Sequence, residues 1–439
     1  MPIVPLPTLC TVLLLLGAAA RAVRAAEYPP PREVDVRRAA AAGLRLLEGR
    51  RLRLFTDLPS SPAVDELPAV FDAAVPQWAA YFGVPDAAPR RFLGFLVGDR
   101  QRLASLELLP ADNPGFINGY AKGYELWLAD QPSDYYRRHL LLHEGTHAFM
   151  QTQLGGCGDP WYMEGMAELL GTHTWRDGRL QLGVFPANRD DFPMWGRVKL
   201  IREALAAKHA WRLERVLAVD NSRALSTDQY AWTWALAALL DGRPQYRQRF
   251  RQLKQYAADP AFSDRFRQLF ADDWDDLALD WQAYIAELDY GADLRRTAIM
   301  HRQPAPLGPS RESASIAADR GWQATPWLLQ AGKSYRLAAS GRYAIAHDGE
   351  PWPCEPGGVT IQYHNGRPLG VLLGALRAID GRSAAFATPT TIGLGATITP
   401  QQDSVLYVRV NDSAAKLGDN SGELTVTIEP ARGESVPGR

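Results

Sequence analysis

The sequence has almost no net charge, which limits the kinds of partner it can bind. Its 48 basic and 49 acidic residues leave a formal net charge of −1. Proteins that bind nucleic acid or anionic membrane surfaces usually carry a local or global excess of Lys and Arg. We therefore expect no nucleic-acid partner, and a small or neutral polymeric substrate fits this composition better.

Cysteine is also scarce, with three residues in a chain of 439. Cys10 lies in an N-terminal apolar segment that we expect to be removed, which leaves Cys157 and Cys354. Two cysteines cannot form a disulfide framework. They can form a single bridge in an oxidising compartment, but the sequence places them in different domains, so a bridge and two free thiols both stay open.

The sequence lacks an apolar run long enough to cross a membrane. The run from Leu9 to Ala20 has about 12 residues, whereas a spanning helix needs roughly 20. Small residues follow it and suit signal-peptide cleavage, although no Lys or Arg precedes it. We expect a signal peptide over residues 1–25, a secreted, periplasmic or cell-surface location, and no transmembrane segment in the mature chain.

The rest of the sequence predicts two domains of different class. Residues 27–302 begin with mixed strand and helix patterns and then become mostly helical, which indicates an α+β domain. Residues 303–312 contain three prolines and have the composition of a linker. Residues 313–432 show short β-type runs between Gly, Pro, Asn and Asp turns, which predicts an all-β sandwich.

Within the first domain, the apolar patterns predict strands over 52–58, 91–97 and 119–129 and a helix over 63–82. The strand over 119–129 lies just before the helix that contains residues 143–147. It is therefore placed to lie along a cleft beside that segment.

The most informative segment is His-Glu-Gly-Thr-His over residues 143–147, in a helix expected to begin after Ser133 and to end at Gly155. Two histidines four residues apart on a helix project to one face, where both can bind one metal ion. The alternative is a helix whose histidines merely cap or pack. That alternative is weakened by a following helix, expected from Pro160, which carries two glutamates on one face.

This pattern resembles the gluzincin metallopeptidases, the clan of thermolysin and the zinc aminopeptidases, over roughly residues 50–300. In that clan, His-Glu-x-x-His is followed by a glutamate in the next helix. The resemblance implies an α+β peptidase domain that is mostly helical around one zinc ion. It implies the ligands His143, His147 and Glu164, with Glu144 as the general base that takes a proton from zinc-bound water.

The resemblance assigns two further residues to the site. Glu168, one turn after Glu164, matches the acidic residue that orients the first histidine. Tyr230 matches the tyrosine that donates to the oxyanion in the aminopeptidase branch, and the alternative is an aromatic side chain that only packs. His139 is expected to be solvated or to support a ligand, and Cys157 to be a loop cysteine, so that neither binds the metal.

In the second domain, the informative segments are 406–412 and 418–422, which lie around the loop between the last two expected strands. They resemble the calcium-dependent galactophilic bacterial lectins. The resemblance implies a Ca²⁺ site formed by oxygen atoms of Asp412, Asp419 and Asn420, and a capacity to bind glycans. Asp, Asn, Ser and Gly are also common turn formers, so an ordinary loop is the alternative.

The expected function is that of an exported zinc metallopeptidase that acts on a peptide or protein substrate, with a C-terminal module that binds a glycan or a surface. One alternative is a catalytically inactive zinc-containing binding protein, against which Glu144 argues because a structural site needs no base. The other is a zinc hydrolase with a non-peptide substrate. The aminopeptidase segment Gly-x-Met-Glu-Asn has no match, which favours endopeptidase or unusual specificity.

Overall fold

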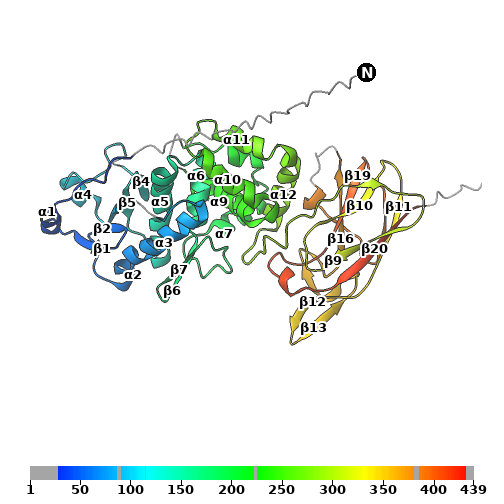
Figure 1. Ribbon diagram of the computed structural model, residues 1–439. Coiled ribbons are helices and arrows are strands. Elements are labelled where there is room, and N and C mark those ends of the chain that lie inside the picture. Colours follow the sequence, from blue (N-terminus) through cyan, green and yellow to red (C-terminus); the bar gives the residue numbers. More distant parts are fainter. Residues whose placement is uncertain (1–27, 87–89, 114, 222–224, 380–384, 432–439) are drawn as a thin grey trace, which may run out of the picture.

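The computed structural model shows a largely helical first domain and a β-rich second domain (Figure 1). The expected combination of helices with several β-sheets is confirmed. Within the described part of the chain, no helix is both long and apolar enough to cross a membrane. The expected signal peptide over 1–25 lies outside the described residues, which are 28–86, 90–113, 115–221, 225–379 and 385–431.

The first domain begins with a five-stranded sheet in the order β1-β2-β3-β5-β4. Its central strands β2, β3 and β5 are parallel, whereas the edge strands β1 and β4 are antiparallel to their neighbours. The strand bounds are β1 (Arg45–Glu48), β2 (Leu52–Thr56), β3 (Phe92–Val97), β4 (Gly119–Lys122) and β5 (Glu125–Ala129).

The single strand expected over 119–129 is instead a hairpin. Gly123 adopts a left-handed backbone (φ 58°), and this turn folds β4 back onto β5. Strand β4 therefore forms one of the two edges of the sheet, and it lies next to α5 (Asp134–Leu154). As expected, α5 starts after Ser133, whose hydroxyl accepts from the Tyr136 amide, and ends at Gly155 in the left-handed region.

Helices cover both faces of this sheet. Helices α3 (Leu67–Phe82) and α5 share one apolar core with β2, β3 and β5, and α1 (Val36–Ala41) and α4 (Arg100–Ser105) lie on the other face. The helices between Pro160 and Glu287 extend the first core, as expected for the later, mostly helical part of residues 27–302. The other elements of this domain are α2 (Pro62–Asp65), α6 (Pro160–Gly171), β6 (His173–Arg176), β7 (Arg179–Leu182), α7 (Arg197–Ala206), α8 (Leu213–Leu217), α9 (Thr227–Gly242), α10 (Pro244–Gln252), α11 (Phe262–Leu269) and α12 (Trp274–Glu287).

The second domain has two main sheets, in the orders β17-β16-β19-β10-β8 and β18-β11-β20-β9. Side chains from both sheets form one core, in which Trp327 and Val408 meet Leu337 and Val426. The strands of the two sheets are β8 (Ala305–Pro306), β9 (Glu312–Ala317), β10 (Gln323–Leu329), β11 (Tyr335–Ser340), β16 (Leu372–Ala378), β17 (Thr390–Thr391), β18 (Gly395–Ile398), β19 (Ser404–Val410) and β20 (Glu423–Pro430). Two hairpins add β12 (Tyr343–Asp348), β13 (Glu350–Cys354), β14 (Val359–His364) and β15 (Arg367–Leu369).

Part of the segment expected as a linker, 303–312, belongs to the second domain. Strand β8 pairs in parallel with β10 at the edge of the sheet. Proline is tolerated there because an edge residue has a neighbour on one side only, so its missing N–H interrupts no ladder. The prolines of this segment therefore did not prevent strand formation.

The two domains are in contact along α12. Leu279 and Ala283 on this helix share an apolar cluster with Leu373 and Tyr407 of the second domain. An ion pair of 2.5 Å between Arg377 and Asp276, and another between Arg409 and Glu287, flank that cluster. Apolar and charged contacts therefore both join the domains.

Candidate metal centre

The centre is formed by two helices whose positions are fixed by their neighbours. His143 and His147 lie one turn apart on α5, and Glu164 lies on α6, which packs against α5 and α9. A side chain added at Gly165 would lie 2.8 Å from the carbonyl oxygen of Thr233, so α6 approaches α9 closely. All three predicted ligands are buried and are brought together.

The three ligand atoms form a nearly equilateral triangle. Nε2 of His143 lies 3.2 Å from Nε2 of His147 and 3.2 Å from Oε2 of Glu164, and the third side is 3.3 Å. Ligand atoms that bind zinc tetrahedrally at about 2.0–2.1 Å are separated by about 3.3 Å. Among the described residues, Oε2 of Glu164 has no partner in hydrogen-bond geometry. The donor set and its spacing therefore fit a zinc ion.

The electrostatics of the centre favour a cation. Burial disfavours a charged imidazole, yet Glu164 and Glu168 raise the pKa of His143 to about 10. Burial likewise opposes ionisation of Glu164, but His147 and His143 lower its pKa to about 2. A buried carboxylate surrounded in this way requires positive charge nearby, which protons or a divalent metal ion can supply.

Glu144 is buried and lines a cavity of about 530 Å³ together with Tyr230 and two of the predicted ligands, His143 and Glu164. Burial raises the pKa of its carboxyl group. A Cβ atom at Gly119 would collide with Oε1 of Glu144 and lie 2.7 Å from its Cδ. Strand β4 therefore lies directly against the predicted base, and only glycine leaves room for it.

Tyr230 lies one turn into α9, whose start is fixed by a capping box between Ser226 and Gln229. Its ring forms an edge-to-face pair with His143 at a centroid distance of 5.7 Å and lines the same cavity. Burial and the nearby carboxylates, led by Glu164, raise the pKa of Tyr230. The hydroxyl therefore keeps its proton at neutral pH and can donate a hydrogen bond.

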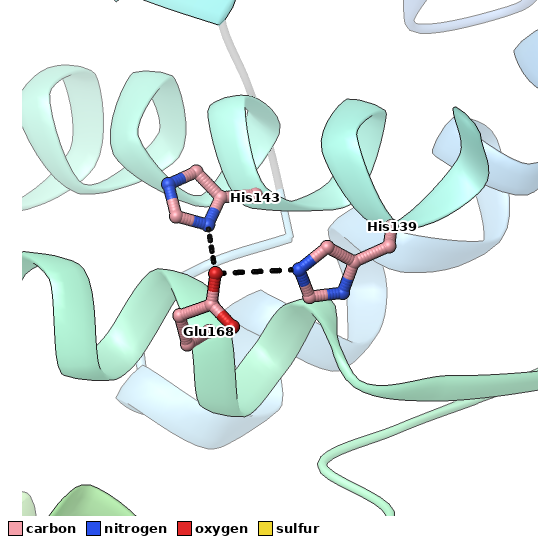
Figure 2. A group of neighbouring side chains, drawn as sticks. All are labelled: His139, His143 and Glu168. Atoms are coloured by element: carbon pink, nitrogen blue, oxygen red, sulfur yellow. Dashed lines mark hydrogen bonds and ion pairs between the residues drawn. The ribbon is translucent and has the colours of Figure 1, made fainter. Parts of the chain in front are cut away.

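Glu168 faces α5 and lies between two histidines (Figure 2). Its Oε1 atom is 3.3 Å from Nδ1 of His143 and 3.4 Å from Nε2 of His139. His139 is buried and supports the centre, and it is not solvated. The sequence did not point to Arg197, which contacts both oxygens of Glu168 at 2.9 Å. Its position on α7 follows no motif, and it is one of 48 basic residues.

The cysteines do not contribute ligands. The Cys157 thiol donates to the carbonyl oxygen of His147 at 3.7 Å, so it faces backbone. Cys157 and Cys354 are both buried and free. The possible bridge between them is therefore absent from this structure, because each lies inside a different domain.

The three residues predicted to bind calcium lie between β19 and β20. Oδ2 of Asp412, Oδ1 of Asp419 and Oδ1 of Asn420 are buried, and none has a hydrogen-bond partner among the described residues. Burial raises the pKa of Asp412. Unsatisfied buried oxygens are costly, and a hard cation such as Ca²⁺ is the ligand that oxygen donors of this kind accept. The loop therefore offers three unpaired buried oxygens of the kind that a calcium ion accepts.

No family model matches this chain, and no curated protein matches it. Among solved structures, a PllA-like lectin, the EclA N-terminal domain, is 18% identical with a TM-score of 0.21, and the match covers 27% of this chain and 95% of the lectin. PliG of Aeromonas hydrophila, a periplasmic inhibitor of g-type lysozyme, is 8% identical with a TM-score of 0.19, covering 30% and 98%. At these scores neither similarity assigns a fold or a function.

Proposed function

We propose that this chain is an exported zinc metallopeptidase of the gluzincin type. The observation that carries the proposal is the triangle of His143, His147 and Glu164, of which His143 and Glu164 line a cavity that Glu144 also lines. A structural zinc site is usually closed by four protein ligands, whereas a catalytic site has three and keeps one position open. Three ligands beside a cavity and a buried carboxylate support the catalytic type.

The roles of the residues follow from their positions. Zinc supplies Lewis acidity and makes water more acidic when it is bound by the three ligands. Glu144 accepts a proton as water attacks the substrate carbonyl, and it then donates that proton to the departing nitrogen. Tyr230 donates a hydrogen bond to the carbonyl oxygen as that oxygen gains negative charge.

The cavity suits a peptide in an extended conformation. Its volume of about 530 Å³ lies within the range of ligand sites, roughly 300–1,000 Å³. Gly119 and Asn118 place the free edge of β4 along it, and an edge strand can pair with an extended peptide through backbone hydrogen bonds. Peptides and proteins are therefore the proposed substrates.

For the second domain, we propose calcium binding by Asp412, Asp419 and Asn420 and calcium-dependent binding of a glycan. The unpaired buried oxygens support the ion. Calorimetric titration with Ca²⁺ tests the ion, and a glycan array with and without EGTA tests the sugar. An array on which nothing binds in a calcium-dependent way would refute the glycan part alone.

The catalytic proposal is tested by metal analysis, cleavage of a peptide library, and a Glu144→Gln variant. We expect one zinc ion in the first domain, inactivation by chelator and recovery with zinc. Glu144→Gln keeps the ion and lowers peptide cleavage by about 10²–10⁴-fold, because it cannot accept the proton. Glu203→Gln, which changes an exposed carboxylate on α7, serves as the control.

Other outcomes separate the alternatives. Zinc binding without peptide cleavage, together with hydrolysis of an ester that depends on Glu144, would indicate a hydrolase of non-peptide substrates. Zinc binding without any hydrolysis would indicate a binding protein. A Glu144→Gln protein that cleaves peptides at the full rate would refute the mechanism.

A further inference from the structure

We infer that Arg197 is a positioning residue of the metal centre, which holds Glu168 in the orientation that directs His143 toward the ion and which also prevents a second ion from binding. The inference rests on the proposed zinc centre but not on the nature of the substrate. Arg197 touches neither the three ligand atoms nor Glu144 in any hydrogen bond or ion pair recorded among the described residues.

Arg197 forms a buried, bidentate ion pair with Glu168. Its Nε atom donates to Oε2 and its Nη2 atom donates to Oε1, both at 2.9 Å. The two residues are 3% and 1% exposed. A planar guanidinium that engages both oxygens fixes the plane of the carboxylate, which a single contact does not do. The orientation of Glu168 is therefore set from α7, an element outside the metal motif.

The held carboxylate in turn acts on the ligand. Oε1 of Glu168 lies 3.3 Å from Nδ1 of His143 and 3.4 Å from Nε2 of His139 (Figure 2). When the proton of the neutral His143 ring lies on Nδ1, this N–H donates a hydrogen bond to Glu168. The Nε2 atom then keeps a free lone pair for the proposed zinc ion. Arg197 thus acts on the zinc ligand through Glu168.

The same three side chains also have the composition of a second metal site. One ligand atom each from His139, His143 and Glu168 lie within 4.8 Å of one another, and all three residues are buried. Arg197 disfavours a second ion for two reasons. Its positive charge already neutralises Glu168, and its Nη2 atom donates a hydrogen bond to Oε1, the same oxygen that a second ion would need. A second cation on that oxygen would be repelled by the guanidinium at short range.

Arg197 also contacts the second catalytic element. The central carbon of its guanidinium lies 5.6 Å from the centre of the Tyr230 ring, within the range of a cation–π contact. The same ring forms an edge-to-face pair with His143. One side chain therefore holds the carboxylate behind the ligand and packs against the tyrosine at the cavity, so its loss disturbs both.

The test measures zinc affinity by competition with a chelator, with no substrate present. The variants are Arg197→Met, Glu168→Gln and the double variant, in which no buried charge is left unpaired. We expect each single substitution to weaken zinc binding by about 10–100-fold. The double variant should bind zinc no more weakly than the weaker single variant, because the two residues act in series. Arg197→Lys should restore only part of the affinity, since an ammonium cannot make the paired contact.

The matched control is Arg243→Met. Arg243 is another fully buried arginine of the first domain. It forms an ion pair of 2.8 Å with Asp280, and neither residue of this pair is a predicted metal ligand. The Arg243→Met variant should lose about as much thermal stability as Arg197→Met does, but it should retain the zinc affinity of the wild type. The visible spectrum of the cobalt-substituted protein should change in Arg197→Met and stay unchanged in Arg243→Met, which separates positioning from general stability.

Several results would overturn the inference. These are wild-type zinc affinity in Arg197→Met, an equal loss of affinity in Arg243→Met, and a second tightly bound zinc ion in the wild type that disappears in His139→Ala. A wild-type chain that binds no zinc would overturn both this inference and the proposed function. A chain that binds zinc with the expected dependence on Arg197 but hydrolyses no peptide would refute only the proposed function.

Discussion

The two candidate metal sites of this protein are built in opposite ways. In the first domain, two imidazoles and one carboxylate come from two packed helices and stand 3.2–3.3 Å apart. In the second domain, three oxygen donors come from one loop between two strands. A small set of ligands that includes imidazole nitrogens suits zinc, whereas a set of oxygen ligands alone suits calcium. In the first candidate site, packed helices hold the donors in place, whereas in the second the oxygens of one loop have no partner among the described residues.

The loop of the second site also touches the first domain. The carbonyl oxygen of Ala414 accepts from the Asp293 amide at 3.0 Å. Arg409 donates to the carbonyl oxygen of Asp412 at 2.7 Å and forms an ion pair with Glu287 on α12. The proposed calcium site is thus connected to the contact between domains, while the residues of the proposed zinc site all lie within the first domain.

The largest expected effect is the loss of zinc binding without any change in calcium binding. His147→Ala removes one of three zinc ligands and should weaken zinc binding by about 10³-fold, with loss of peptide cleavage. Calcium-dependent stabilisation should be unchanged, because no residue of that loop is affected. Equilibrium dialysis and thermal unfolding with and without Ca²⁺ measure the two effects. His209→Ala, at an exposed histidine of the same domain, should alter neither.

A second prediction tests whether the first site is rigid around its base. Gly119→Ala should lower cleavage by about 100-fold with zinc retained, because the new methyl group displaces the Glu144 carboxylate. Gly115→Ala is the matched control, since it lines the same cavity and its added Cβ meets no atom within 4 Å. Equal activity of the two variants would show that Glu144 tolerates movement or is not the base.

A third prediction concerns the calcium loop. Ca²⁺ at 100 times its dissociation constant should add about 2.7 kcal/mol to the free energy of unfolding, since it binds only the folded loop. Asp412→Asn should abolish this gain and leave zinc content and cleavage intact. Thermal unfolding with Ca²⁺ and with EGTA measures it, and Glu429→Gln on β20, a partly exposed carboxylate, is the control. A calcium effect that persists in Asp412→Asn would place the ion elsewhere.

The smallest expected effect tests the connection between the domains. Glu287→Gln leaves Arg409 without its carboxylate partner close to the calcium loop, so the guanidinium should repel the ion more strongly. We expect calcium affinity to fall by about 2–5-fold, with zinc affinity unchanged. Calorimetric titration measures this change. Unaltered calcium affinity would show that the ion pair joins the domains without influencing the loop.

The sequence predicted the helix of the metal motif well because its signals are local. Ser133 caps its start, Gly155 ends it in the left-handed region, and the spacing of two histidines places them on one face. The prediction of a single strand over 119–129 failed because one residue, Gly123, turns the chain back, and strand periodicity continues on both sides of it. Glycine in a strand pattern signals a bulge or turn, which was the available clue.

The sequence by itself determined which residues can serve as ligands, base and calcium donors, since side-chain chemistry and spacing along one helix or loop are properties of the chain. Tertiary structure decided what surrounds them. Arg197 reaches Glu168, Gly119 meets Glu144, and α12 joins the second domain only because distant segments pack together. Contacts of this kind depend on how helices and sheets are stacked, and no local pattern in the sequence records that arrangement.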